Sequence, residues 1–365
     1  MRIRLQSSSS GIALVIVMLV ILVLATLAGA FALSMKVEIT LARNSNYESE
    51  LEWLGRSGVE LAKFAIAEQA KIAGEGNYES LNQKWAGGPG GIAGSNSPLA
   101  QISMENNQLG NGTISVKITD MERKFNINVA DRLVLQQALV VLMGVDASLV
   151  STISDSILDW IDKDEDNHLS GVESDYYMGL NPPYVAKNGP LDDISELLLI
   201  KGILDNPEIY WGSASTNHSI SAFQSRGNPA FPDRQQPWYP VGLVDIFTTL
   251  SSGRININTA PATTLQTIPG MDENIAAAII KFRSGLDDAD GTEDDVPMRN
   301  VNELGRIPGI RPDTVAQISR YCDVRSSTFE VQVDVDFNGV KRQYFSVIRK
   351  GTRAGDFGIL KFYWK

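Results

Sequence analysis

The sequence of 365 residues has a single cysteine, Cys322, and only two histidines, His168 and His218. One cysteine excludes an intrachain disulfide and a zinc site built from several thiolates. Two histidines supply little material for a two-histidine metal site or for a catalytic triad. The sequence therefore offers no nucleophile–base pair, and we expect a protein that is not an enzyme.

Positive charge is also in short supply, because 32 Lys and Arg stand against 43 Asp and Glu and give a formal charge of −11. Non-specific binding of nucleic acid rests on neutralising phosphates, so a protein this acidic is a poor candidate for it. The apolar fraction of 43% excludes wholesale disorder, and the length is sufficient for two or three domains with their own cores.

Charge is absent from a long apolar segment, residues 12–33, near the N-terminus. About 20 apolar residues cross the core of a bilayer as a helix. Arg2 and Arg4 precede the segment, so the positive-inside rule predicts a cytoplasmic N-terminus. A single pass then places the remaining residues across the membrane, which in a diderm bacterium is the periplasm. The alternative is a signal peptide, which usually has a shorter apolar stretch that ends at an A-x-A cleavage site.

No proline occurs before Pro89, and apolar residues keep a helical spacing beyond the membrane segment, at Leu51, Leu54, Leu61 and Phe64. We therefore expect one helix over residues 12–68, about 85 Å long at 1.5 Å per residue. A helix of that length needs packing partners, which indicates an assembly.

The remaining sequence predicts an α+β protein in which a sheet is interrupted by a helical insert. Residues 71–112 are rich in Gly, Asn and Ser, and residues 99–105 and 113–119 are expected to be strands. Strand character returns in residues 329–348, with Asn338-Gly339 as a type I′ hairpin turn. The predicted divisions are 12–68 (long helix), 69–120 (first part of the sheet), 121–325 (insert, with parts 121–205 and 251–325 and a connector 206–250) and 326–365 (last strands).

The insert contains an internal echo. The sequence FNINVADRLVLQQAL begins at Phe125, and ININTAPATTLQTIP begins at Ile255. Both place Asn-x-Asn ahead of a helix start, where Asn, Thr and Asp suit turns and N-caps. We interpret the echo as two similar entries into helical parts.

An acidic segment of the insert, residues 159–175, has the spacing of a calcium-binding loop. Aligned with an EF-hand, Asp162, Asp164 and Asp166 take positions one, three and five, and Glu173 takes position twelve. Hard oxygen ligands at alternating positions suit Ca²⁺. We therefore expect bound calcium with these four residues as candidate ligands.

Further positions of this alignment agree less completely. The carbonyl of His168 falls at position seven, Ser170 at position nine and Leu169 at the apolar eighth position, but Asn167 replaces the usual glycine. Asn tolerates the left-handed conformation better than most residues. The alternative is a solvated acidic loop, although residues 155–175 carry eight acids against Lys163 alone, a crowding that destabilises without a cation.

A second acidic loop with the sequence LDDADGTEDD has a weaker calcium signal, for which Asp288, Asp290 and Asp294 are the candidates. On either side of it lie two helix–hairpin–helix-like patterns, around Pro269-Gly270 and Pro308-Gly309. Nucleic-acid-binding hairpins offer backbone N–H groups to phosphate, but here Asp272 and Arg311 replace the second glycine, and residues 254–323 hold seven Lys or Arg against eleven Asp or Glu. We interpret both hairpins as helix-packing units.

The N-terminal fifty residues resemble the type IV pilin-like superfamily, whose members have a short basic leader that ends in glycine before an abrupt apolar helix. The resemblance makes residues 1–11 the leader, and it places prepilin-peptidase cleavage and N-terminal methylation between Gly11 and Ile12. Most members have a glutamate at the fifth mature position, which pairs with the amine of the previously added subunit. Here that position is Ile16, and its lack of a carboxylate suits a subunit at the very tip.

The whole chain resembles one family within that superfamily, the K-class minor pseudopilins of type II secretion (general secretion pathway protein K, GspK). The resemblance rests on the leader, on Ile16 and on an ordered series of segments: DWID at 159–162, DYYMGLNPPYVAKNGPLDDISELLLIKGI at 175–203, ININTAP at 255–261, IPGM at 268–271 and RYCDVRSSTFEV at 320–331. It implies a pseudopilin fold with a helical insert of two sterile-alpha-motif-like parts, bound calcium, and a pseudopilus tip formed with the minor pseudopilins I and J.

From this resemblance we expect a structural protein of the bacterial inner membrane that supports protein export across the outer membrane. Its expected partners are the minor pseudopilins I and J, other pseudopilins and the prepilin peptidase, with the secretin or a secreted substrate as further contacts and no nucleic acid. Three alternatives stay open: a membrane-anchored DNA-uptake protein, a type IV pilus tip protein and an anchored periplasmic hydrolase.

Overall fold

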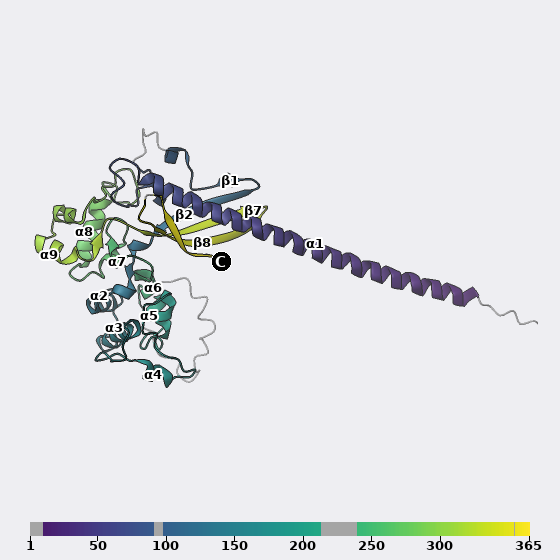
Figure 1. Cartoon of the computed structure of the whole chain (residues 1–365), viewed down its shortest axis with the longest axis horizontal. Coiled ribbons are helices and arrows are strands. Elements are labelled where there is room, and N and C mark those ends of the chain that lie inside the picture. Colours follow the sequence, from purple (N-terminus) through teal and green to yellow (C-terminus); the bar gives the residue numbers. More distant parts are fainter. Residues whose placement is uncertain (1–9, 91–97, 213–238, 354) are drawn as a thin grey trace, which may run out of the picture.

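The computed structural model describes residues 10–90, 98–212, 239–353 and 355–365. Its first element is one continuous helix, α1 (Ser10–Gln69), which is about 90 Å long at 1.5 Å per residue. The prediction of a single helix over 12–68 is thus confirmed. The N-terminal half of α1 projects away from the rest of the molecule, and its C-terminal half lies on the sheet (Figure 1).

The sheet has five antiparallel strands in the order β1-β2-β7-β8-β9. Asn338 and Gly339 both have positive φ angles, 52° and 83°, and join β7 to β8 as the sequence predicts for a type I′ turn. The strands are β1 (Asn107–Leu109), β2 (Gly112–Asp120), β7 (Thr328–Phe337), β8 (Val340–Lys350) and β9 (Phe357–Trp364).

Helix α1 packs closely on the sheet because two of its glycines face large side chains. A Cβ at Gly55 would lie 2.6 Å from the Tyr344 ring, and one at Gly58 would lie 2.4 Å from Val333 Cγ1. Around these contacts lies the first hydrophobic core, to which Leu51 and Leu54 of α1 and Phe329 and Val331 of β7 contribute fully buried side chains. The expected strand at 99–105 is wrong. Pro98 opens a 3₁₀ turn (Pro98–Gln101), whose Leu99 is buried in this core.

The helical insert leaves the sheet at the end of β2 and returns at the start of β7, as the α+β interpretation predicts. It has its own hydrophobic core and lies at the end of the sheet away from the apolar half of α1 (Figure 1). Its helices are shorter than the sequence suggests: α2 (Arg132–Gln137, continued by a π-helical turn, Ala138–Leu142), α3 (Ala147–Ile161), α4 (Ser174–Met178), α5 (Glu208–Trp211), α6 (Leu243–Ile246), α7 (Ala262–Leu265), α8 (Glu273–Arg283) and α9 (Pro312–Ile318).

Two pairs of short parallel strands explain the internal echo of the insert. In the first part β3 (Phe125–Asn126) pairs with β4 (Phe247–Thr248), which lies in the predicted connector, so the end of the connector belongs to the first part. In the second part β5 (Ile255–Asn256) pairs with β6 (Cys322–Asp323). Most of the expected connector, residues 213–238, lies outside the described residues.

Candidate functional site

The first acidic loop follows helix α3, which presents a row of carboxylates at its C-terminal end. The apolar face of α3, with Ile153, Ile157 and Trp160, is buried in the core of the insert. Asp155 and Asp159 are four residues apart and share one helix face, and both are also buried.

The chain after α3 folds back over these carboxylates. Asp159 Oδ1 accepts the backbone N–H of His168 at 3.0 Å, and Asp155 Oδ2 accepts that of Ser170 at 3.0 Å. Gly171 is required here, because a Cβ at this position would lie 1.9 Å from Asp159 Oδ2. These contacts hold the loop against the helix.

The structure brings three of the four predicted calcium ligands together. Oxygens of Asp162, Asp164 and Glu173 all lie within 4.8 Å of one another. The fourth candidate, Asp166, is exposed and is not in this group, although its backbone N–H donates to Asp164 Oδ1 at 3.1 Å.

A second group of three overlaps the first and contains residues that the EF-hand alignment misses as side-chain ligands. Asp159, Asp162 and the His168 ring place one ligand atom each within 4.8 Å of the others. The imidazole Nδ1 contacts Asp159 Oδ1, while the His168 carbonyl, expected as a ligand, accepts the N–H of Gly171 at 3.1 Å. The signal for Asp159 was its spacing of three from Asp162, which places both at the end of one helix.

Several oxygens at this site are buried without a hydrogen-bond donor among the described residues: Asp159 Oδ2, Asp162 Oδ1 and both carboxylate oxygens of Glu173. Glu173 is only 4% exposed. Burial, followed by the charges of Asp159 and Asp162, raises the pKa of Glu173 to about 7. Burial and the charges of Asp164 and Asp159 also raise the pKa of Asp162. Converging oxygens that lack donors fit a hard divalent cation such as Ca²⁺.

The second acidic loop is organised differently. The Arg283 guanidinium donates two hydrogen bonds to Asp290, one of 2.9 Å from Nε and one of 2.7 Å from Nη2. Asp294 accepts the backbone N–H of Leu286 at 2.6 Å and the Thr292 hydroxyl at 2.8 Å, and these hydrogen bonds lower the pKa of Asp294. Asp288 occupies the turn with a positive φ of 57°. The loop is closed by its own contacts, so Asp288, Asp290 and Asp294 stay a prediction without support from the geometry.

Both helix–hairpin–helix patterns form hairpins between short helices. Gly270 and Gly309 have φ angles of 90° and 93°, which favour glycine. Asp272 caps α8 by accepting the N–H of Ile275 at 2.8 Å, so a carboxylate already occupies this helix N-terminus. A Cβ at Gly270 would lie 2.8 Å from the Gln317 side chain of the next hairpin. These contacts agree with the interpretation of the hairpins as packing units.

Helix α1 carries the remaining predicted residues. Gly11 and Ile12 lie in its first turn, and residues 1–9 of the expected leader lie outside the described residues. Ile16 is 57% exposed within a series of exposed apolar side chains that continues to Leu41. Of the helices that the structure describes, α1 is long and apolar enough to cross a membrane.

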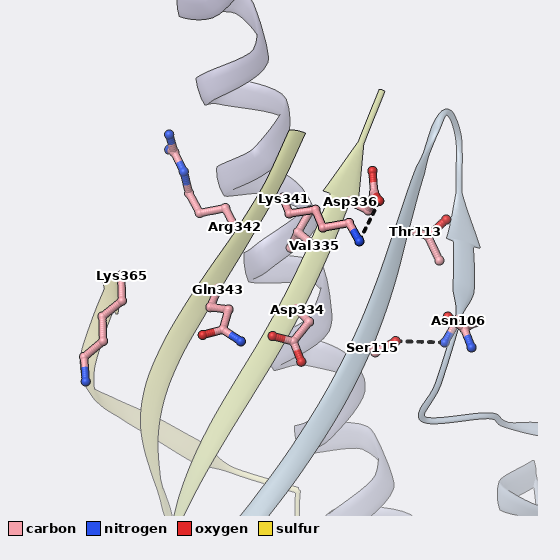
Figure 2. A pocket seen from close by; sticks show the side chains of 10 residues that line it. All are labelled: Asn106, Thr113, Ser115, Asp334, Val335, Asp336, Lys341, Arg342, Gln343 and Lys365. Carbon is pink, nitrogen blue, oxygen red and sulfur yellow. Dashed lines mark hydrogen bonds and ion pairs between the residues drawn. The ribbon is translucent and has the colours of Figure 1, made fainter. Parts of the chain in front are cut away.

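A cavity of about 520 Å³ lies along β2, β7 and β8 of the sheet. Figure 2 shows its ten lining residues, which include neither a histidine nor a cysteine. Lys341 Nζ lies 4.0 Å from Asp336, and Ser115 Oγ accepts the N–H of Asn106 at 3.0 Å.

Comparisons with known proteins match the two helical parts separately. Residues 122–210 match the family model "Type II secretion system (T2SS), protein K", and residues 251–323 match a helix–hairpin–helix motif. The chain is 29% identical to type II secretion system protein K of Klebsiella pneumoniae, over 25% of this chain and 32% of that protein. It is 26% identical to the Pseudomonas aeruginosa protein of the same name, over 40% of this chain and 43% of that protein. The chain thus spans about a third to less than half of these relatives.

A longer match of 22% identity joins the chain to type II secretion system protein K of Aeromonas hydrophila, over 66% of this chain and 67% of that protein. The fold is similar to a chain in the crystal structure of the GspK-GspI-GspJ complex from the enterotoxigenic Escherichia coli type 2 secretion system. That match has a TM-score of 0.60 at 21% identity and covers 89% of this chain and 99% of the other. The resemblance to type II secretion system protein K that the sequence motifs predict is therefore confirmed.

Proposed function

We propose that this chain is a structural minor pseudopilin of the K class, which occupies the tip of a type II secretion pseudopilus and supports protein export across the outer membrane. The observation that carries the proposal is the position of the insert. It interrupts the sheet between β2 and β7 and lies at the end of the sheet opposite the apolar half of α1, with α8 and α9 beyond the C-terminal end of α1 (Figure 1). In a filament built from parallel helices, a body in that position would sit above the subunit and block further addition.

The proposed partners follow from the apolar half of α1 and from the complex in which the similar chain occurs. The exposed apolar side chains of this half of the helix need either lipid or other apolar helices around them. We propose that before assembly the lipid of the inner membrane surrounds this half of α1, with the C-terminal domain in the periplasm. In the assembled state, the helices of other pseudopilins surround it. The similar chain forms a complex with GspI and GspJ, and we propose the equivalent I and J subunits as partners here.

Ile16 supports the tip position by its chemistry. A carboxylate at this depth of an apolar helix bundle would need a charged partner, and an isoleucine needs none. We propose that processing between Gly11 and Ile12 by the prepilin peptidase, with methylation of the new N-terminus, precedes assembly.

We further propose that calcium is a structural ligand of the first acidic loop. The residues that would hold it are Asp162, Asp164 and Glu173, with Asp159 and His168 close by. A bound cation would neutralise carboxylates that otherwise repel one another, and so fix the loop on helix α3. No step of this proposed function is chemical catalysis.

The first experiment is N-terminal sequencing of the membrane-extracted chain, produced with and without a prepilin peptidase. A methylated start at Ile12 that depends on the peptidase is the expected result. An intact Met1, or a cut near Ala30, would remove the assembly proposal.

The second experiment tests the tip position. Ile16→Glu should impair or misplace tip assembly and reduce secretion, because it adds a carboxylate that has no partner above it. Ile16→Leu is the matched control and should behave as the wild type. Normal secretion and normal co-purification of the I and J subunits by Ile16→Glu would contradict the tip assignment.

A further inference from the structure

The two edges of the sheet differ in length and in composition. One edge is β1, which has only three residues, whereas the other is β9, which has eight. In the part of the chain that the structure describes, β9 has β8 as its single strand neighbour. Natural sheets usually blunt a long edge strand, since its unpaired backbone groups can pair with another chain.

The unpaired backbone groups of β9 can be identified from the register. Lys365 N–H donates to Gln343 O at 3.1 Å, so this pair is a hydrogen-bonded one. Pairs of an antiparallel ladder alternate, and Phe362 and Trp364 therefore belong to non-hydrogen-bonded pairs, with Ser346 and Tyr344. Their N–H and C=O groups point away from β8, toward the free edge.

Apolar and aromatic side chains line this edge on the side of α1. Phe362 stacks on Tyr344 with 5.6 Å between ring centroids, and the Arg56 guanidinium lies 4.7 Å from the Phe362 ring. Trp364 is 57% exposed, and Leu360, at the irregularity opposite Val347 and Ile348, is 42% exposed. Aromatic residues and arginine are the residue types that dominate binding energy at protein interfaces.

Positive charge lines the same edge on the opposite face. In β9 and directly after it, Lys361 and Lys365 alternate with Phe362 and Trp364 and therefore lie on the face of the sheet away from α1. Lysines often protect an edge strand by projecting across it. Here Lys361 turns to Asp193 at 3.2 Å, and Lys365 lies 5.2 Å from the Phe345 ring (Figure 2 shows Lys365 beyond β8). Both ammonium groups have contacts within the chain, and the edge stays open.

We propose that the free edge of β9 is a docking site for an extended acidic segment of another protein, which adds a sixth strand to the sheet. Its apolar side chains would lie beside Leu360, Phe362 and Trp364, and its acidic side chains beside Lys365, which has no carboxylate partner among the ion pairs of the described residues. Strand β7 has such an alternation of apolar and acidic residues and pairs with β8 of this sheet, where its Asp336 lies opposite Lys341. The site uses the sheet edge rather than α1, so it is separate from the helix-mediated assembly proposed above.

Hydrogen–deuterium exchange of the full chain in detergent tests this site. The probe is a short synthetic peptide of alternating valine and aspartate, and the control is a peptide of alternating valine and lysine. The acidic peptide should slow exchange in residues 357–365 roughly tenfold, because it pairs the outward N–H groups. The basic peptide should leave this exchange unchanged.

A matched pair of variants locates the charge preference. Lys365→Glu should abolish protection by the acidic peptide, whereas Lys341→Glu, on the same face but away from the edge, should retain it. The proposal is overturned if the acidic peptide protects no residue of β9 or if the basic peptide protects it equally. It is also overturned if protection rises with protein concentration alone, which would identify a second copy of the chain as the occupant.

Discussion

The two helical parts of the insert begin alike. In the first part, Asn126 Oδ1 accepts the N–H of Asn128 at 3.0 Å, and Asn128 exchanges two hydrogen bonds with the backbone of Leu191. In the second part, Asn256 Oδ1 accepts the N–H of Asn258 at 2.9 Å, and Asn258 exchanges two with the backbone of Met298. The Asn-x-Asn echo is therefore one structural device used twice: a turn followed by a clamp on a distant peptide.

The same two parts diverge in their acidic loops. The first loop leaves the carboxylates of Asp162 and Glu173 without enough donors, while the second satisfies Asp290 with Arg283 and Asp294 with backbone N–H groups. Acid density is high in both sequences. Partners from within the chain, rather than the number of acids, therefore distinguish a candidate cation site from a self-contained loop.

The two parts are also attached to the sheet by different chemistry. The first part contacts β9 through an ion pair between Asp193 and Lys361, whose side chains are partly exposed. The second part is held through the buried carboxylate of Asp120, at the end of β2, which accepts hydrogen bonds from Thr259 at 2.5 Å and Ser326 at 2.7 Å.

Substitution of Arg283, the buried positive side chain at the second acidic loop, should have the largest effect on stability. Arg283 is 3% exposed and also donates to Ile257 O and Ala260 O, at 2.8 Å each. Arg283→Met should lower the free energy of unfolding by about 3 kcal/mol, because it leaves Asp290 and two carbonyls without their donor. Urea unfolding of the detergent-solubilised chain measures this, and Arg254→Met, at an exposed pair, is the control. Equal midpoints for the two variants would contradict the account of this loop.

Calcium should stabilise the protein through the first loop and not through the second. At 100 times the dissociation constant, a ligand that binds the folded state stabilises it by about 2.7 kcal/mol. The melting temperature should rise on adding calcium and fall on adding a chelator. Glu173→Gln should abolish this response, and Asp294→Asn should preserve it. A response that survives Glu173→Gln would place the ion elsewhere.

The two asparagine clamps should differ in strength because their burial differs. Asn258 is 2% exposed, whereas Asn128 is half-buried. Asn258→Ala leaves a buried N–H and a buried C=O of Met298 unsatisfied and should cost about 2 kcal/mol, while water can replace part of the Asn128 clamp, at a cost of about 1 kcal/mol. Thermal unfolding of both variants checks the order, and a larger loss for Asn128→Ala would reverse it.

The attachment of the second part should also make stability depend on pH. Burial, followed by the charge of Glu122, raises the pKa of Asp120 from 3.8 to about 7. Since the folded pKa is raised, the stability that Asp120 contributes is fully present below about pH 4 and is lost as pH rises through about 7. Asp120→Asn should flatten the stability profile over this range. An unchanged profile in thermal unfolding between pH 5 and pH 8 would assign the dependence to another group.

Local sequence signals predicted the elements whose causes are themselves local. The uncharged apolar run without proline predicted α1, and Asn338-Gly339 predicted the β7–β8 hairpin, because both depend on neighbouring residues. The expected strand at 99–105 failed because Leu99 is buried against α1 and the sheet by a 3₁₀ turn that begins at Pro98. Burial against a distant element overrode the local alternation there.

The candidate cation site was predictable in part, because most of its acids are close together in the sequence. Spacing alone grouped Asp162, Asp164 and Glu173, which the structure brings within 4.8 Å of one another. The EF-hand spacing left out Asp159, whose role depends on the loop folding back over α3 and on Gly171 packing against its carboxylate. Nor could the spacing show that Asp166, which belongs to the EF-hand pattern, is exposed and lies outside the group of converging oxygens.

Local sequence was enough to predict the long N-terminal helix, the turn between β7 and β8, and where acids and asparagines cluster. Which acids have a partner became clear from the folded chain: Asp290 lies against Arg283, whereas Glu173 is buried beside other carboxylates. The tertiary structure also decided which strand is left at the edge of the sheet. The physical reason is that a backbone dihedral depends on adjacent residues, whereas the charge state and pairing of a group depend on burial and on partners that chain folding brings from elsewhere.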